Sequence, residues 1–418
     1  MSPFSYPVEY FSCKEFVTDD KNVEGMVNHF AKIGAAVGAV AGETGIDGLK
    51  IDFNNGVRVE VPEGNFHVII GDHDSGKIYY DRDASEKIIV SLEKYYIRWE
   101  IIVLRDGEPV FSHVLDLRGQ NVRLVLDVGG IGDQMSMIPY IKEFAGVHDC
   151  HVTYWTPGKF ADICERLIPD VRPADLAHDD PPYATYELTA AFDFPGAAPH
   201  GSEMVPLESW GQVILGLNRV APPLRWTTKE RAIKEPYVCI SCQGSSVVKG
   251  WVREDGWREV TDYLLSLGYR VICIDKEKEQ TVDGFTTAMP GNAEDFTGGD
   301  VSLAERADML YHADFMIGLS SGLSWIAHEV GCPVIMIGGF SLFWHEFYNP
   351  YRVFNPMACH GCLNDSMKDF RELLCPRQRR GTDGVLECSR RISPKMVIRM
   401  IDQLLDDKKS GRLKDERK

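Results

Sequence analysis

One segment sets the architecture of this chain: Arg123-Leu124-Val125-Leu126-Asp127-Val128-Gly129-Gly130-Ile131-Gly132-Asp133. Its first half is an almost uninterrupted apolar run, typical of a parallel strand that is covered on both faces. Its glycines form a turn, and residues 135–144 carry apolar side chains at three- and four-residue spacings, which predicts a helix. The segment therefore predicts a strand, a glycine-rich loop and a helix, the opening unit of an α/β lobe.

The strand and helix alternation continues on both sides of a proline-containing linker at 221–223. Residues 152–155 and 160–167 repeat it before the linker. Beyond the linker, strand-like runs at 237–241, 269–274, 315–318 and 334–337 alternate with helix-like patterns at 257–267, 303–311 and 324–330. Such alternation implies parallel sheets with helices on both faces. We expect an α/β fold with two Rossmann-like lobes, 120–230 and 231–405, facing each other across a cleft.

The N-terminal residues follow a different pattern. Between about residues 51 and 117, apolar and polar side chains alternate, and Asn54-Asn55-Gly56 and Asp106-Gly107 mark turns. This alternation is typical of antiparallel hairpins. It predicts an N-terminal β-rich domain, 1–119, built on a small antiparallel sheet or barrel with a structural or protein-docking role. At the other end, residues 406–418 are highly charged and are expected to form a frayed tail.

Composition restricts the class of protein. The 418 residues are 44% apolar and 26% charged, as in globular proteins that bury several cores. Forty-five Lys and Arg face sixty-two Asp and Glu, and the net charge of −17 disfavours nucleic acid and anionic lipid as partners. We expect no secretory signal and no membrane span. Eleven cysteines, several of them inside apolar runs, indicate a reducing cytosol.

The glycine-rich loop is the first candidate for chemistry. In an open parallel sheet, the carboxyl ends of the strands border the ligand crevice, and this loop follows a strand. It lacks the spacing of a dinucleotide fingerprint, and no P-loop lysine follows it. Its glycines allow close approach of a substrate, and Asp133 presents a carboxylate at a helix start. Two interpretations of Asp133 stay open: a catalytic carboxylate, or a helix N-cap.

Two loops in the second lobe carry the residue types that bind a phosphate. Ser241-Cys242-Gln243-Gly244-Ser245-Ser246 follows a strand and is followed by Lys249. The stretch 318–324 lies between a strand and a helix, so its amides point at an anion from the positive end of the helix dipole. Either loop alone is typical of an ordinary turn with a capped helix, but together they favour a nucleotide diphosphate. The candidate ligands are Gln243, Ser245, Lys249, Ser320, Ser321, Gly322 and Leu323.

The cysteine spacing near the C-terminus is the most specific local pattern. Cys359 and Cys362 form a Cys-x-x-Cys pair, and Cys375 and Cys388 follow after twelve residues each. Four thiolates in a loop-like region match a tetrahedral site, for which zinc is the usual metal and a single rubredoxin-like iron the less frequent one. Because the cysteines lie outside both anion loops, we expect the metal to shape a finger at about 355–392.

A second Cys-x-x-Cys pair, Cys239 and Cys242, lies in an apolar strand. Residues three apart in a strand face opposite sides of the sheet, so this pair is assigned to the core. The alternative for the four later cysteines is a set of free thiols whose spacing arises by chance.

Three of these segments together resemble a known family. The loop 129–133, the stretch from Gln243 to Trp251 and the stretch from Asp314 to Ser324 resemble the lipopolysaccharide heptosyltransferases, GT-B enzymes that use ADP-heptose. With the four-cysteine insert and the N-terminal β domain, the chain is still more similar to the bacterial autotransporter heptosyltransferases. Those are cytoplasmic enzymes that attach heptose to serine residues of autotransporter adhesins. The resemblance extends from about residue 50 to 405.

The resemblance implies roles for individual residues. The family's catalytic carboxylate falls on Asp133, its donor-phosphate lysine on Lys249, and its diphosphate loop on 320–323. It also implies one structural iron ion per chain, with zinc as the chemical alternative, and a large homo-oligomer such as a dodecamer-like ring. The lipopolysaccharide enzymes often carry Asp-Thr-Gly or Asp-Ser-Gly in the diphosphate loop, whereas this chain has Ser320-Ser321-Gly322 and lacks that carboxylate.

The expected reaction is transfer of heptose from ADP-heptose to a serine hydroxyl of an autotransporter adhesin, with inversion at the anomeric carbon. Serine is a poor nucleophile at neutral pH, so a carboxylate such as Asp133 has to accept its proton. Lys249 and the loop around Ser321 stabilise the departing ADP. No Asp-x-Asp occurs in either anion loop, so no catalytic divalent metal is required. Two alternatives stay open: a lipopolysaccharide-core heptosyltransferase, and a non-catalytic sugar-nucleotide-binding assembly protein.

Overall fold

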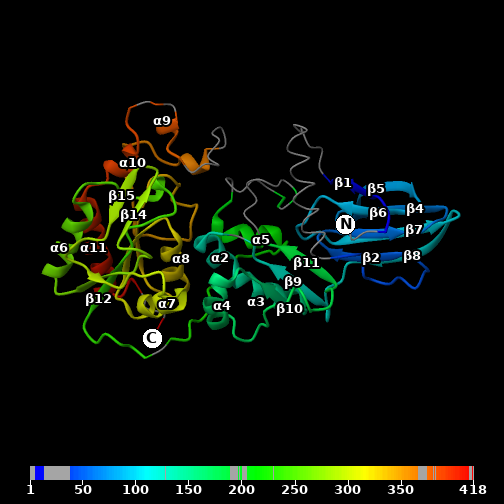
Figure 1. The fold of residues 1–418 in the computed structure, drawn as a ribbon, viewed down its shortest axis with the longest axis horizontal. Coiled ribbons are helices and arrows are strands. Elements are labelled where there is room, and N and C mark those ends of the chain that lie inside the picture. The colour runs from blue at the N-terminus through cyan, green and yellow to red at the C-terminus, as the bar shows by residue number, and fades with distance from the viewer. Residues whose placement is uncertain are drawn as a thin grey trace.

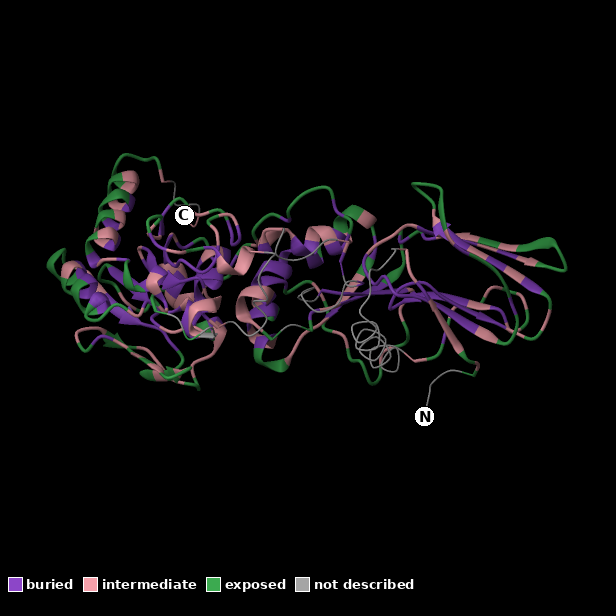
Figure 2. Ribbon diagram, turned by 90° about the horizontal axis from the view of Figure 1, so that it is seen from above, coloured by how far each residue is buried: buried purple, intermediate pink, exposed green. Residues whose placement is uncertain are grey.

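Three blocks lie in a row in the computed structural model: an N-terminal β region, a first α/β lobe and a second α/β lobe (Figure 1). The structure describes residues 5–13, 38–127, 129–188, 196, 198–199, 205–228, 230–365, 374–379, 381, 383–413 and 417. Val128, which the sequence places in a strand, lies outside them. Buried residues run along the strands of all three blocks and along the inner sides of the helices of the two lobes (Figure 2).

The N-terminal region contains a four-stranded antiparallel sheet with the strand order β5-β4-β7-β8. Its strands are β4 (Phe66–Asp72), β5 (Lys77–Ala84), β7 (Trp99–Arg105) and β8 (Glu108–Val114). On β4, Phe66, Val68 and Ile70 are buried, and the residues between them are only partly buried. This is the alternation that a half-buried strand requires, and the period-two pattern predicted it.

The other N-terminal strands join the sheet of the first lobe, which has seven strands in the order β1-β6-β3-β2-β11-β9-β10. They are β1 (Val8–Phe11), β2 (Lys50–Asn54), β3 (Arg58–Val61), β6 (Lys87–Ser91), β9 (Asn121–Val125), β10 (His151–Trp155) and β11 (Ala184–Glu187). The division expected at residue 119 is therefore not a boundary between two sheets.

The physical reason is that β2 is buried on both faces. It pairs in parallel with β11, and its polar residues find buried partners there and on β3. Asp52 forms an ion pair with Arg58 at 2.6 Å, and the Thr185 hydroxyl donates to the Asn54 side chain at 2.8 Å. A period-two pattern assigns Asp52 and Asn54 to solvent, so the sequence did not reveal this connection.

The glycine-rich loop leads into two short helices, α2 (Ile131–Met137) and α3 (Pro139–His148), where the sequence predicted one helix over 135–144. Pro139 is the first residue of α3 and has no N–H to continue the preceding helix. Because α2 begins at Ile131, the helix starts directly at the loop, four residues earlier than expected.

The second lobe has a six-stranded sheet in the order β16-β13-β12-β17-β18-β19, and every pairing is parallel. Its strands are β12 (Tyr237–Ile240), β13 (Arg270–Cys273), β16 (Glu294–Asp295), β17 (Met316–Leu319), β18 (Val334–Ile337) and β19 (Arg352–Val353). Its main helices are α6 (Gly256–Ser266), α7 (Leu303–His312), α8 (Gly322–Glu329) and α11 (Pro394–Lys409). The predicted strand and helix alternation is confirmed here, but the hairpin of β14 (Glu279–Val282) and β15 (Phe285–Ala288) was not expected.

The charged tail begins later than expected. Helix α11 extends to Lys409, so residues 406–409 are helical. Lys408 and Lys409 occupy its last turn, where cations interact favourably with the negative end of the helix dipole. Near the end of the chain, the Arg417 guanidinium donates to the Tyr311 carbonyl at 2.8 Å, so this part of the predicted frayed tail is docked on α7.

The two lobes meet where α2 and α8 pack together (Figure 1). A Cβ at Gly132 would lie 2.9 Å from the Trp325 ring, and a Cβ at Gly322 would overlap the side chain of Ile131. The absence of side chains at these two glycines lets the N-terminal ends of α2 and α8 meet. A second contact joins α4 (Ala161–Leu167) to α7, where Arg166 binds both carboxylate oxygens of Asp308 at 2.6 and 2.7 Å.

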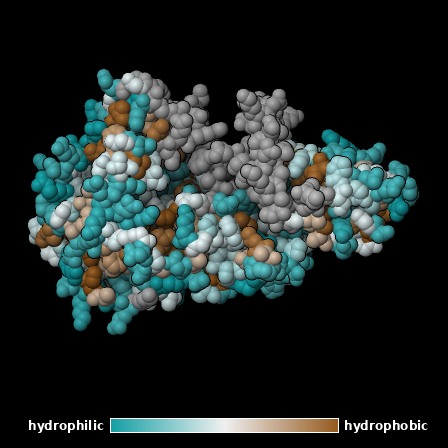
Figure 3. Space-filling view, viewed as in Figure 1, coloured by the Kyte–Doolittle hydropathy of each residue, from teal (hydrophilic) through white to brown (hydrophobic). Residues whose placement is uncertain are grey.

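Within the described part of the chain, no helix is both long and apolar enough to cross a membrane. On the face drawn in Figure 3, hydrophobic residues occur in small separate groups among hydrophilic ones.

Candidate active site

A cavity of about 420 Å³ lies between the lobes, where loops leave the carboxyl ends of their parallel strands. Every catalytic or donor-binding residue predicted from the sequence lines it: Asp133, Gln243, Ser245, Lys249, Ser320, Ser321, Gly322 and Leu323. Three segments that were singled out separately in the sequence thus surround one space. A nucleotide diphosphate needs this kind of convergence at the strand ends.

Asp133 is the third residue of α2, and the N-cap of that helix is Gly130. The N-cap interpretation of Asp133 is therefore wrong. Its carboxylate lies over the open space at Gly130, where a Cβ would overlap it. Burial raises the pKa of Asp133, and Lys249 and the residue's own backbone amide partly oppose this shift. A carboxylate with a raised pKa on a cavity wall is suited to accept a proton.

Lys249 approaches Asp133 from the second lobe. It ends the short 3₁₀ turn η4 (Val247–Lys249), which begins where the Ser246 hydroxyl oxygen accepts the Val248 N–H at 3.4 Å. Burial lowers the pKa of Lys249, while Asp133 and Glu346 raise it. An ammonium group withdrawn from water interacts more strongly with a phosphate than one on the surface does.

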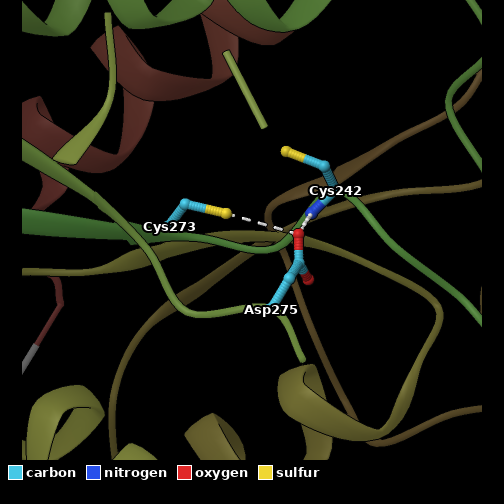
Figure 4. Close-up of side chains that lie close together, drawn as sticks. All are labelled: Cys242, Cys273 and Asp275. Atoms are coloured by element: carbon cyan, nitrogen blue, oxygen red, sulfur yellow. Dashed lines mark hydrogen bonds between the residues drawn. The ribbon is translucent and has the colours of Figure 1, made fainter. Parts of the chain in front are cut away.

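Asp275, which the sequence analysis missed, holds the first phosphate loop in place. It follows β13, and its carboxylate accepts the Ser241 hydroxyl at 2.7 Å and the Cys242 N–H at 2.8 Å. Figure 4 shows the Asp275 carboxylate between Cys242 and Cys273. Gln243, the residue after Cys242, is also held in place, because its side-chain amide donates to the Glu277 backbone carbonyl at 2.6 Å.

Cys242, Cys273 and Asp275 also form a group whose ligand atoms all lie within 4.8 Å of one another, close enough to hold a metal ion. Their bonding fits a hydrogen-bonded core better. The Asp275 oxygens already accept protein donors, including the Cys273 thiol at 3.4 Å. Burial raises the pKa of the Cys242 thiol, which favours its neutral form, and a metal ligand has to be a thiolate. The assignment of Cys242 to the core agrees with this bonding.

The second phosphate loop precedes α8. Ser321 is the N-cap of that helix and makes no side-chain capping hydrogen bond. Its hydroxyl is buried and has no partner among the described residues, although it borders the cavity. A free hydroxyl beside the positive end of an eight-residue helix suits an anion. The neighbouring Ser320 hydroxyl is already used, because it donates to the Glu346 carboxylate.

Sequence reasoning missed further residues of the lining. Lys159 donates to the Gly129 carbonyl at 2.7 Å and so ties the glycine-rich loop to the first lobe. His345 and Glu346 reach the cavity from the segment between β18 and β19. Asp275 could have been found, because it follows a strand that the sequence predicts. No sequence signal marked Glu346.

The four later cysteines come together around Cys388. Cys375 and Cys388 are buried, and Cys359 and Cys362 are half-buried. Burial and then the thiols of the other three cysteines raise the pKa of Cys388 to about 12, so all four lie within electrostatic reach. Among the described residues, no three of these sulfur atoms lie within 4.8 Å of one another. The donor set nevertheless fits a metal, since a cation removes the repulsion between thiolates.

Two protein families match parts of the chain. Residues 45–107 match the N-terminal domain of glycosyltransferase TibC. Residues 218–364 match glycosyltransferase family 9, the heptosyltransferase family. The second match covers the linker, both phosphate loops and the first two cysteines of the finger.

Similarity to individual proteins covers most of the chain. It is 37% identical over 369 residues to the autotransporter heptosyltransferase BAHTCr of Citrobacter rodentium, covering 86% of this chain and 90% of that protein. It is 31% identical over 367 residues to the inactive autotransporter heptosyltransferase BimC of Burkholderia thailandensis, covering 86% of each.

Solved structures share the fold over nearly the same length. The iron-containing dodecameric glycosyltransferase TibC of enterotoxigenic Escherichia coli superimposes with a TM-score of 0.83 at 34% identity, covering 88% of this chain and 98% of TibC. TibC in complex with ADP-D-β-D-heptose gives a TM-score of 0.82 at 35% identity. These similarities confirm the two-lobed GT-B architecture that the sequence predicted.

Proposed function

The chain belongs to the autotransporter heptosyltransferases, and we propose that it transfers heptose from ADP-heptose to a serine hydroxyl of an autotransporter adhesin. The observation that carries this proposal is the pairing of Asp133 from one lobe with Lys249 from the other on a single cavity. A GT-B reaction needs a base for the acceptor and a cation for the departing diphosphate. The donor is supported by the ADP-D-β-D-heptose complex of TibC, and the acceptor class by the names of the relatives.

In the proposed reaction, the serine oxygen attacks the anomeric carbon of the heptose from the side opposite the diphosphate. The bond between that carbon and the phosphate oxygen breaks, and its electron pair leaves with ADP, so the anomeric configuration inverts. The serine proton passes to the Asp133 carboxylate, which its raised pKa makes a better acceptor. We propose that Lys249 and the Ser321 hydroxyl stabilise the negative charge that develops on the departing ADP.

Family membership does not by itself establish catalysis, because one relative is named as inactive. The test is to incubate the purified protein with ADP-heptose and adhesin fragments and to measure the mass of the products. We expect a gain of one heptose per modified serine, and a gain that is slower by roughly 10²- to 10⁴-fold after Asp133→Asn. Unmodified fragments together with intact ADP binding would support the non-catalytic alternative, and transfer to a lipopolysaccharide core would support the other enzyme.

We also assign one structural iron ion per chain to the thiolates of Cys359, Cys362, Cys375 and Cys388. Four thiolates fill a tetrahedral shell and leave no position for water or substrate, so the ion would hold the finger together. The iron-containing TibC supports iron over zinc.

Elemental analysis tests this assignment. We expect one iron per chain in the wild type and in Cys242→Ser, and none in Cys388→Ser. Loss of the metal in Cys242→Ser alone would instead place the ion in the buried group of Cys242, Cys273 and Asp275.

We propose that copies of the chain assemble into a large homo-oligomer with a ring-like arrangement, which the dodecameric state of TibC supports, and that the enzyme acts in the bacterial cytoplasm. Light scattering should give a mass of many chains, and a monomer would contradict the ring.

A further inference from the structure

The diphosphate loop of this chain has no acidic residue of its own, but the fold brings one to it. Glu346 lines the cavity beside Ser320 and is 3% exposed. Its carboxylate accepts the hydroxyl hydrogens of Ser320 and of Ser341, the latter at 2.7 Å. Ser320 follows β17, whereas Glu346 lies between β18 and β19, so two neighbouring connections of the sheet are joined at this point.

Arg352 balances the charge of Glu346. This arginine lies on β19, the edge strand of the sheet, and is 8% exposed. Its guanidinium pairs with the Glu346 carboxylate and donates to the Ser341 hydroxyl oxygen at 2.7 Å. Burial raises the pKa of Glu346, but Arg352, His345 and the Ser320 hydroxyl outweigh this and hold it below its ordinary value. The carboxylate is therefore ionised and fixed in one orientation.

Glu346 is also one of two carboxylates that act on Lys249. The other is Asp133 on α2, which reaches the lysine from the opposite lobe. His345, next in the chain to Glu346, faces Lys249 too, and burial lowers the pKa of its imidazole. Lys159, Asp275 and Lys276 complete the charged lining.

We propose that Glu346, held by Arg352, is a positioning residue of the donor site, which fixes Ser320 in the diphosphate loop and places negative charge beside Lys249. In this way a carboxylate from another segment does the work of an acidic residue within the loop. Glu346 does not contact the diphosphate, which it would repel; it acts through Ser320 and Lys249. The inference rests on the proposed function, because it takes the cavity to be the ADP-heptose site.

ADP binding, measured by calorimetry across a range of pH, tests the proposal without any acceptor. In Glu346→Gln, ADP affinity should fall roughly tenfold at neutral pH, the effect of losing a hydrogen bond to a charged group. The KM for ADP-heptose should rise with it, and kcat should change little. The loss of ADP affinity in alkaline solution should also move to lower pH, because Lys249 then gives up its proton more readily.

The matched control is Glu329→Gln. Glu329 is a buried carboxylate on α8, and within the described residues it does not line the cavity. Burial raises its pKa to about 8, so it is largely neutral at pH 7 and a neutral amide replaces it closely. ADP affinity and its pH dependence should stay at the wild-type values.

A second variant separates positioning from folding. Glu346→Gln leaves Arg352 without its anion and should lower the melting temperature. Ser320→Ala keeps that ion pair and removes only its link to the loop, so it should weaken ADP binding at nearly unchanged stability. In the double variant, the two losses of ADP affinity should be less than additive.

Wild-type ADP affinity and pH dependence in Glu346→Gln, or strictly additive effects in the double variant, would overturn the inference and leave the proposed function standing. A wild-type protein that binds ADP but modifies no adhesin would overturn the proposed acceptor and leave the role of Glu346 standing. Absence of ADP binding in the wild type would overturn both.

Discussion

The two lobes build the cavity in different ways. The first lobe supplies its candidate base from one continuous segment, 129–133, at the end of β9. The second lobe supplies separate groups from 243–249, 275–276, 320–323 and 345–346. Proton transfer can be assigned to one side chain, whereas a diphosphate needs donors and positive charge from several directions. Changes in the first-lobe segment should therefore reduce turnover, and changes in the second lobe should reduce donor affinity.

The largest effect is expected for Asp133→Asn. Loss of the general base should lower kcat by roughly 10²- to 10⁴-fold. ADP affinity should change far less, because Asp133 acts on donor binding only through its charge beside Lys249. Stopped-time transfer assays and calorimetry measure the two quantities separately. The control is Asp127→Asn. Asp127 is an exposed carboxylate just before the same loop, and its replacement should keep wild-type turnover. An Asp133→Asn variant that loses ADP binding while retaining kcat would break the division between the lobes.

The next largest effect is expected for Lys249→Ala. Removing a charge-assisted contact should raise the KM for ADP-heptose by roughly ten- to a hundredfold, with a smaller change in kcat. Lys249→Arg keeps the charge and should recover part of the affinity. Lys278→Ala is the matched control, because Lys278 pairs with Asp295 at 2.6 Å and, within the described residues, does not line the cavity. A pure loss of kcat in Lys249→Ala would contradict the assignment of donor binding to the second lobe.

A pH profile gives a smaller but more specific signal. Asp133 can accept a proton only when it is ionised, and burial raises its pKa above the ordinary value of 3.8. Turnover should therefore be full above the raised pKa and fall as the pH drops through it. The effect of Asp133 on the free energy of unfolding has the opposite sign. The folded state binds the proton more tightly than the unfolded state does, so ionised Asp133 destabilises the fold at pH values above its raised pKa.

Asp133→Asn should accordingly lose the acid limb of kcat/KM in its residual activity and unfold at a slightly higher temperature at pH 7. Rate profiles and thermal melts of the two proteins check both signs. An unchanged acid limb in the variant would assign that limb to another group.

Local patterns in the sequence predicted most of the fold. Apolar runs marked β9, β12 and β17, and alternation marked β4 and β7, because each pattern is set by which side of a strand is buried. Long-range pairing was not predictable in the same way. Asp52 and Asn54 look solvent-facing in sequence, and only the folded chain supplies Arg58 and Thr185 as their partners.

The same distinction applies to the site. Asp133, Lys249 and Ser321 were found because each follows a strand within a recognisable loop, and all three line the cavity. The four cysteines were found from spacing. Glu346 was missed because its partner Ser320 lies 26 residues away on another connection, so no local pattern links them.

The smallest effect is expected for Asp275→Asn, and it tests the division of roles between the two lobes most specifically. The Asp275 carboxylate accepts the Ser241 hydroxyl and the Cys242 N–H, whereas an asparagine keeps one acceptor oxygen and turns an NH₂ group towards a donor. The lost hydrogen bond costs roughly 1 kcal/mol, and because burial already raises the pKa of Asp275, the gain from burying a neutral group offsets part of it. The KM for ADP-heptose should rise only a few-fold, with kcat and iron content unchanged, because the first phosphate loop loosens while Asp133 and the four cysteines are untouched. Steady-state kinetics and elemental analysis of the same sample test this prediction. Loss of kcat with an unchanged KM would mean that the second lobe also takes part in the chemical step. Loss of iron would instead place the metal at Asp275, Cys242 and Cys273, and not in the finger.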